Sequence, residues 1–146
     1  MKDINLNEIE MNGKKYPFYC DLNVLELIQD SFKSVNQFER DILGLSPIRD
    51  ENGEVKRNDK GEILHEQIEP KIKAVAFGVF IMIREGQRIR ERETGEKSPE
   101  ITMEDIREGC RTSFIDLSVK VAEEFNKCFE VKKKENPKAS RKSIAK

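Results

Sequence analysis

The single histidine of the chain, His65, is the one imidazole that could act as a general base or a metal ligand. It lies in a polar stretch beside Glu66, a few residues before Pro70, and no nucleophile motif surrounds it. A histidine-based metal site needs further ligands, and a catalytic triad needs a nucleophile next to its base. His65 is therefore predicted to be a surface histidine with no catalytic role.

The three cysteines, Cys20, Cys110 and Cys128, are widely spaced along the chain. No CxxC or CxxH motif is present, so the spacing indicates neither a zinc site nor a disulfide framework. Each cysteine lies at strand or helical spacing from apolar neighbours. All three are predicted to pack as small buried hydrophobic side chains.

Phosphate-binding loops and paired catalytic carboxylates are not recognisable either. The glycines of the polar middle segment, Gly53 and Gly61, match neither GxxxxGK[ST] nor GxGxxG and are typical of turns. Acidic pairs such as Glu123-Glu124 follow from composition, and beside Lys120 and Lys127 they are expected to form solvated ion pairs. The sequence thus predicts no enzyme, no cofactor and no metal.

The composition of the chain limits the classes of protein to which it can belong. Of 146 residues 38% are charged, against about 25% in ordinary soluble domains. The 27 basic and 28 acidic residues nearly cancel, so no overall field attracts nucleic acid or an acidic membrane. The longest uncharged apolar run, 74–83, is about half a membrane span, and no signal peptide is recognised. We therefore expect a soluble, intracellular protein with one domain over residues 1–130.

The N-terminal segment has the pattern of a β-hairpin. Apolar residues alternate over 4–11 and again over 16–20, and between them lies Asn12-Gly13, the pair that two-residue hairpin turns favour. The alternation changes phase near residues 7–8, which predicts a bulge there. Pro17 cannot donate a ladder hydrogen bond, so the second strand is expected to have a free edge.

After the hairpin, apolar residues recur at the spacing that is typical of helices. Asp21 or Asn23 is a candidate N-cap for a first helix, and a second helix is expected from Ser34 to Gly44. Residues 68–89 predict a central helix that is apolar on every side. The rest of so short a chain has difficulty covering such a helix, which favours a homo-oligomer.

Two more helices are expected after the central one. Charged residues 84–97 are either a linker or the frayed end of the central helix. Thr102 and Asp105 match a capping pattern for a short helix. A last helix then carries an apolar stripe of Phe114, Leu117, Val121, Phe125, Cys128 and Phe129.

Two segments differ from this helical pattern. Turn signals at 50–53 and 58–61 predict a solvent-exposed excursion over 46–65, with one small hairpin and no internal repeat. Residues 131–146 hold seven basic residues and one acidic residue, a charge of +6, which leaves −7 on the first 130. With almost no apolar residues, 131–146 is predicted to be a disordered basic tail. Its charge could neutralise phosphates, but no aromatic residue is present to stack bases, which argues against nucleic-acid binding.

The stretch from the hairpin to the start of the second helix contains several short motifs: Asn12-Gly13-Lys14, Tyr16-Pro17, Asp21-Leu22-Asn23, Leu25-Glu26 and Phe32-Lys33-Ser34. Together they resemble the opening of tail assembly chaperones, small proteins of phages and prophages with long, non-contractile tails, especially those of Gram-positive hosts. The similarity continues loosely through 71–86, 101–106 and the following helix, about two thirds of the chain, but leaves out 46–65 and the tail.

The resemblance implies a non-enzymatic role in the host cytoplasm. Such chaperones bind the long, aggregation-prone tape measure protein, recruit tail tube protein subunits and are absent from the mature virion. Many also have a longer, frameshifted form, and codons for a lysine run such as residues 132–134 can form the slippery tract. The alternatives are a small nucleic-acid-associated or regulatory protein that uses its basic tail, and an orphan oligomerisation domain.

The predicted architecture is α+β and mostly helical, with an N-terminal β-hairpin packed on about five helices and a disordered basic tail. The partner-binding surface is predicted on the exposed side of the last helix and on the tail. Its candidate residues are Lys120, Glu124, Lys127, Lys132, Lys133 and Lys134.

Overall fold

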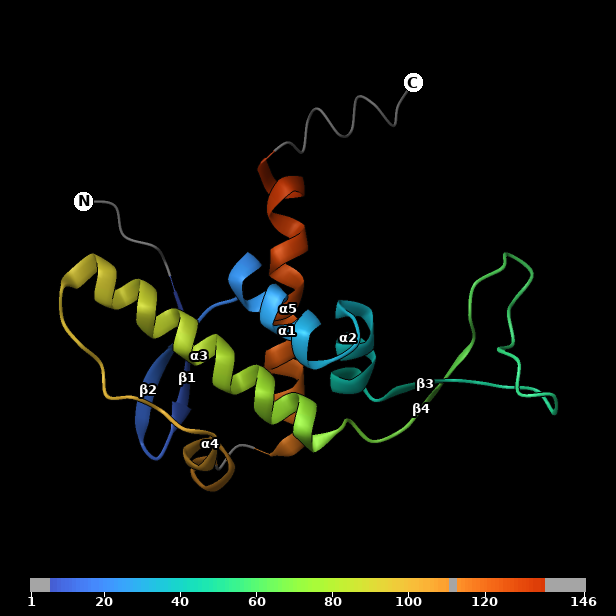
Figure 1. Ribbon diagram of the computed structural model, residues 1–146, viewed down its shortest axis with the longest axis horizontal. Coiled ribbons are helices and arrows are strands. Elements are labelled where there is room, and N and C mark those ends of the chain that lie inside the picture. Colours follow the sequence, from blue (N-terminus) through green and yellow to red (C-terminus); the bar gives the residue numbers. More distant parts are fainter. Residues whose placement is uncertain (1–5, 111–112, 136–146) are drawn as a thin grey trace.

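The computed structural model describes residues 6–110 and 113–135, the last six of them as backbone only. It confirms the predicted α+β class: an N-terminal hairpin packs on a mostly helical body that contains five helices within the described residues (Figure 1). The elements are β1 (Asn7–Met11), β2 (Lys14–Phe18), α1 (Leu22–Ser31), α2 (Val35–Leu43), β3 (Leu45–Pro47), β4 (His65–Gln67), α3 (Ile72–Thr94), α4 (Met103–Gly109) and α5 (Phe114–Glu135).

The hairpin has the predicted turn but not the predicted bulge. Asn12 and Gly13 have φ values of 53° and 75°, the positive φ that a two-residue hairpin turn of this kind requires. β1 and β2 pair in unbroken antiparallel register from Asn7 opposite Phe18 to Met11 opposite Lys14. The phase change near residues 7–8 coincides with the start of β1, so no extra residue enters the ladder. Residues 1–5, included in the predicted alternation, lie outside the described residues.

Side-chain capping begins three of the helices at the residues expected from the sequence. Asp21 accepts a hydrogen bond from Val24 N at the start of α1, and Ser34 accepts one from Gln37 N at the start of α2. Thr102 forms a full capping box for α4 with the third residue of that helix. These caps mark the points where the chain changes direction, and each depends on residues within three positions of the cap.

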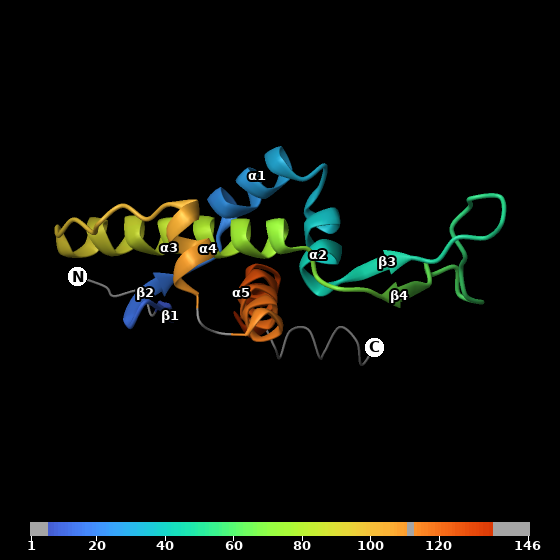
Figure 2. The ribbon, with the colours of Figure 1, turned by 90° about the horizontal axis from the view of Figure 1, so that it is seen from below.

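Helix α3 runs through the middle of the body, with α1 on one side and the hairpin and α5 on the other (Figure 2). Twelve of its 23 residues are buried, so neighbours within one chain cover most of it. The apolar character of this helix therefore gives no reason to require a second subunit. It begins at Ile72, four residues later than predicted, because residues 68–70 continue the chain from β4. The charged segment after residue 84 is regular helix as far as Thr94, and Gly95 caps it with a φ of 79°.

Two glycines let other elements approach α3 closely. A Cβ on Gly86 would lie 2.7 Å from the carbonyl carbon of Pro17, and one on Gly78 would lie 2.8 Å from Val121 Cγ1. Next to Gly86, the backbone N–H of Tyr19 donates a 3.0 Å hydrogen bond to the Met82 carbonyl. β2 thus lies directly on the backbone of α3 at one glycine, while α5 crosses the helix at the other.

Helix α5 continues to Glu135, beyond the tail boundary predicted after residue 130. Lysine is a good helix former, and positive charge near a helix C-terminus interacts favourably with its dipole, so the Lys132–Lys134 run extends the helix. The remaining part of the predicted disordered tail, 136–146, lies outside the described residues.

Residues 45–67 form a ribbon that projects from the body beside α2, in agreement with the predicted exposed excursion (Figures 1 and 2). β3 and β4 pair at its base, where Leu45 lies opposite Gln67. Beyond this base lie two consecutive octads, RDENGEVK at 49–56 and RNDKGEIL at 57–64. The prediction that the chain contains no internal repeat is therefore wrong.

The two octads fold in the same way. The side-chain oxygen Oδ1 of Asp50 accepts hydrogen bonds from the N–H groups two and four residues later, and Asn58 Oδ1 does the same. The octads meet in a closed ring of backbone hydrogen bonds, 2.8–2.9 Å long, whose three members follow one another at intervals of eight residues along the chain. In this ring Ile48 N donates to Leu64 O, Leu64 N to Lys56 O, and Lys56 N to Ile48 O.

Candidate functional site

The part of the chain that the structure describes shows no cluster of three His, Cys, Asp or Glu side chains that could hold a metal ion. Among the same residues no helix is long and apolar enough to span a membrane. His65 is exposed on β4, as predicted.

A groove of about 640 Å³ lies between the end of α2, the β4–α3 connection and the first half of α5, and its walls are mostly apolar. Four large apolar side chains on its walls are exposed: Leu43 by 36%, Ile68 by 38%, Ile115 by 57% and Val119 by 47%. We call this hollow, with these four exposed side chains on its walls, the apolar groove. Such a gathering of exposed aliphatic side chains in one hollow is typical of a surface that binds a partner.

Polar groups in the walls of the groove are largely satisfied from within the chain. Gln67 Nε2 donates to three backbone carbonyls, each at 3.0 Å, and Ser118 Oγ donates to the carbonyl of Ile115 at 2.8 Å. Ile68 N donates to Gly44 O at 2.7 Å, which fixes one wall to the end of α2. Among the described residues that line the groove, Glu69 is the one that carries a charge. The groove therefore offers a partner mainly aliphatic surface on a fixed backbone.

A smaller pocket of about 270 Å³ lies on the other side of the first turns of α5. Phe114 and Leu117 of α5 line it together with Ile72 of α3 and Ile106 of α4. Ile72 is 62% exposed. Apolar surface therefore continues around the start of α5 from the groove to this pocket.

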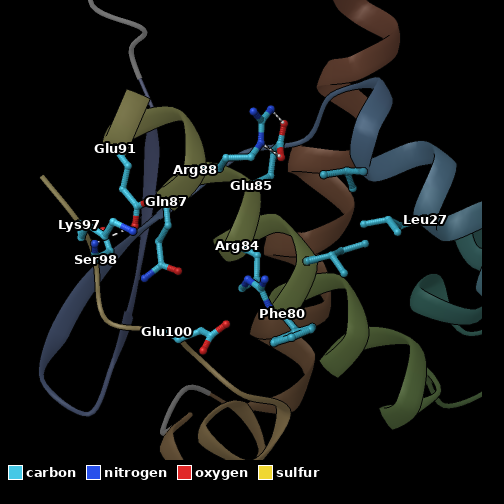
Figure 3. A pocket seen from close by; sticks show the side chains of 12 residues that line it. Leu27, Phe80, Arg84, Glu85, Gln87, Arg88, Glu91, Lys97, Ser98 and Glu100 are labelled. Carbon is cyan, nitrogen blue, oxygen red and sulfur yellow. Dashed lines mark hydrogen bonds and ion pairs between the residues drawn. The ribbon is translucent and has the colours of Figure 1, made fainter. Parts of the chain in front are cut away.

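A second groove, of about 620 Å³, lies between α1, α3 and the segment that leads to α4 (Figure 3). Its polar residues pair with one another: Arg88 contacts Glu85 at 2.7 Å, and Glu91 accepts a 2.7 Å hydrogen bond from Ser98 N (Figure 3). Arg84 lies over the ring of Phe80 at 5.5 Å. The first and third of these pairings lie within α3, and the bond from Ser98 to Glu91 holds the segment that leads to α4 against α3.

Asp21 and Glu85 form a carboxyl pair near this second groove. Hydrogen bonds from Arg88 hold the pKa of Glu85 down at about 2. Burial, together with a hydrogen bond to Glu85, raises the pKa of Asp21 to about 6. Asn23 Nδ2 also donates to Glu85, at 3.1 Å. The Asp21 carboxyl therefore keeps its proton to a higher pH than usual while Glu85 is ionised, and the hydrogen bond from Asn23 to Glu85 joins α1 to the middle of α3.

The predicted partner-binding residues of α5 do not all face solvent. Lys120 and Lys127 are exposed, but Glu124 is only 4% exposed. Its Oε1 accepts a 2.6 Å hydrogen bond from Asn7 Nδ2 and lies 3.5 Å from Lys127 Nζ. The exposed position predicted for Glu124 is wrong, because the buried arc of α5 is wide enough to include it. Glu124 holds β1 against α5.

Lys132, Lys133 and Lys134 lie in α5, and their side chains lie outside the described part of the chain. The residues of the apolar groove were missed as a site by the sequence reasoning. A signal was available, because Ile115 and Val119 lie four residues apart outside the main stripe of α5. Leu43 and Ile68 give no such signal, since both fall within helices predicted from the sequence, 34–44 and 68–89.

Comparison of the chain with protein-family models, with curated proteins and with solved structures gives no match. The apolar groove and the sequence motifs described above are therefore the observations on which a function can be proposed.

Proposed function

We propose that the protein is a non-enzymatic tail assembly chaperone of a phage or prophage, which holds an apolar segment of the tape measure protein in the apolar groove. The observation that carries the proposal is the gathering of Leu43, Ile68, Ile115 and Val119, all partly exposed, around one hollow. The partner is suggested by the sequence resemblance, and the groove supplies a surface of matching chemistry. Recruitment of tail tube subunits in the host cytoplasm belongs to the same proposal.

An amphipathic helix fits the groove best. Such helices bind by laying their apolar face into a hydrophobic hollow, with anchors three and four residues apart. The groove offers aliphatic walls from two helices and one connection, with a single lining charge at Glu69. A long protein that exposes apolar helical faces before assembly would present many segments of this kind.

The size of the groove predicts weak, reversible binding. Full burial of a Leu, Ile or Val side chain stabilises by roughly 1.5–3 kcal/mol, and the four groove residues are already about half covered. Closing the groove therefore contributes roughly 1 kcal/mol for each residue, or roughly 4 kcal/mol in total. This is the low end of the roughly 4–15 kcal/mol that association costs. Firm binding then requires several copies along one partner, which suits a chaperone that must leave afterwards.

The test is co-expression of the chain with the tape measure protein encoded in the same phage or prophage. We expect a soluble complex with the wild-type chain and an insoluble tape measure protein when it is expressed alone. The double variant Ile115→Asp/Val119→Asp should lose the complex while keeping its circular dichroism spectrum. Leu22→Asp is the matched control, because Leu22 is 79% exposed on α1, away from the groove.

Two results would contradict the proposal in different ways. A tape measure protein that stays insoluble with the wild-type chain rules out the chaperone role. A complex that survives the double variant places the partner elsewhere on the surface. Retention of RNA or DNA that is lost at high salt and on deletion of 131–146 would instead support the nucleic-acid alternative.

A further inference from the structure

Cys20 and Cys128 meet in the folded chain although 108 residues separate them. Cys20 lies between β2 and α1, and Cys128 lies in the second half of α5. Their Sγ atoms are 3.0 Å apart and share a hydrogen bond, and neither is oxidised. Because a disulfide bond is about 2.05 Å long, the sulfurs need to approach by only about 1 Å to form one.

The two thiols differ in solvent exposure and in pKa. Cys20 is 5% exposed, whereas Cys128 is half-buried and open to small reagents. The hydrogen bond between them lowers the pKa of Cys128 and raises that of Cys20, and burial raises Cys20 further. The nearby carboxylates of Asp21 and Glu124 oppose ionisation of both thiols. Cys128 is therefore the thiol that ionises first and faces solvent.

We propose that Cys20 and Cys128 form a dithiol site that low-molecular-weight disulfides of the glutathione class oxidise to an intramolecular disulfide. The Cys128 thiolate attacks one sulfur of the small disulfide, which releases one small thiolate and leaves a mixed disulfide on Cys128. Cys20 then loses its proton and attacks Cys128 Sγ, which releases the second small thiol. Two protein thiols are oxidised, one small disulfide is reduced to two thiols, and the released protons end on those thiols.

The bond would join the junction of β2 and α1 to the distal half of α5. Without it, the hairpin is joined to this half of α5 by non-covalent contacts such as the hydrogen bond from Asn7 of β1 to Glu124. Oxidation then prevents the distal half of α5 from leaving the hairpin, and reduction allows it. This inference does not rest on the proposed function, and its test needs no partner protein.

The test uses the purified, reduced full-length chain treated with oxidised glutathione and then alkylated under denaturing conditions. Before alkylation, we expect the mass of the oxidised chain to be lower than that of the reduced chain by two hydrogens. Alkylation should then label one of the three thiols, and a proteolytic fragment should link Cys20 with Cys128. Cys110→Ser is the matched control and should form the same link. Cys20→Ser should stop at a mixed disulfide on Cys128, the trapped intermediate. The thermal midpoint should rise on oxidation in the wild-type chain and in Cys110→Ser, but not in Cys20→Ser.

The same reaction in concentrated urea gives the pairing expected of an unfolded chain. If the folded chain shows no preference for the Cys20–Cys128 link over pairs that include Cys110, the proposal is wrong. It is equally wrong if glutathione reacts with Cys110 while the other two thiols stay reduced, or if the disulfides formed lie between molecules. Intact mass separates these outcomes without any assay of function.

Discussion

Gly86 offers a direct test of how closely the hairpin rests on the central helix. In Gly86→Ala the new Cβ would lie 2.7 Å from Pro17 C, 2.8 Å from Pro17 O and 2.9 Å from Phe18 N. All three are backbone atoms, so no side chain can rotate away. Either β2 moves off α3 or the helix bends, and both changes stretch the hydrogen bond from Tyr19 N to Met82 O.

The expected magnitude combines opposing effects. Alanine is favoured over glycine in a helix interior by about 1 kcal/mol. Forcing an extra carbon into a packed contact costs about 2 kcal/mol, and weakening one backbone hydrogen bond costs about 1 kcal/mol more. The free energy of unfolding of Gly86→Ala should therefore fall by about 2 kcal/mol, equivalent to about 6 °C in thermal midpoint for a chain of this length.

Urea unfolding followed by circular dichroism measures the free energy, and amide hydrogen exchange at Tyr19 reports the local opening. Gly53→Ala is the control, since Gly53 has a φ of +83° but nothing within 4 Å of the added carbon. It should strain only the ribbon and leave exchange at Tyr19 unchanged. If Gly86→Ala is as stable as the wild type, the contact between β2 and α3 yields easily and this account of Gly86 is wrong.

The remaining predictions concern titration and packing. Because the folded chain binds the Asp21 proton more tightly than the unfolded chain, this carboxyl lowers stability as pH rises from about 3.8 to about 6. Asp21→Asn keeps an N-cap and should remove that decline in urea titrations at each pH. Glu85 has the opposite sign: its stabilisation is lost as pH falls from 4.5 towards about 2, and Glu85→Gln should flatten the profile there. Phe38→Ala should cost about 3–5 kcal/mol of unfolding free energy, because the ring is fully buried against two other phenylalanines. Phe129→Ala, at a ring that is 53% exposed, should cost less than half as much in the same urea titration.

Features coded by neighbouring residues could be predicted from the sequence. The hairpin turn at Asn12-Gly13, the caps at Asp21 and Ser34, and the αL end of α2 at Gly44 all depend on the chemistry of a few adjacent side chains. Helical periodicity located the helices, although the start of α3 was missed because the apolar pattern of 68–71 also fits an extended chain.

Features that depend on distant residues could not be predicted in this way. The burial of Glu124 requires knowing that Asn7 lies opposite it, and the meeting of Cys20 with Cys128 requires the path of the whole chain. The octads were overlooked for another reason. They share Arg, Gly and Glu at fixed positions but exchange Asp for Asn and Val for Ile, and their common hydrogen-bond pattern becomes visible only in three dimensions.

The ring formed by Ile48, Lys56 and Leu64 has a consequence for how the chain can change in length. Each member donates to one neighbour and accepts from the other, so the ring is complete with three. Unlike the repeats of a solenoid, which add at an open end, these octads leave no place for another copy. Removing one octad would open the ring and leave only two of its three members. Related chains are therefore expected either to have both octads or to lack both. Deletion of the whole segment between Pro47 and His65 should leave the helical body intact.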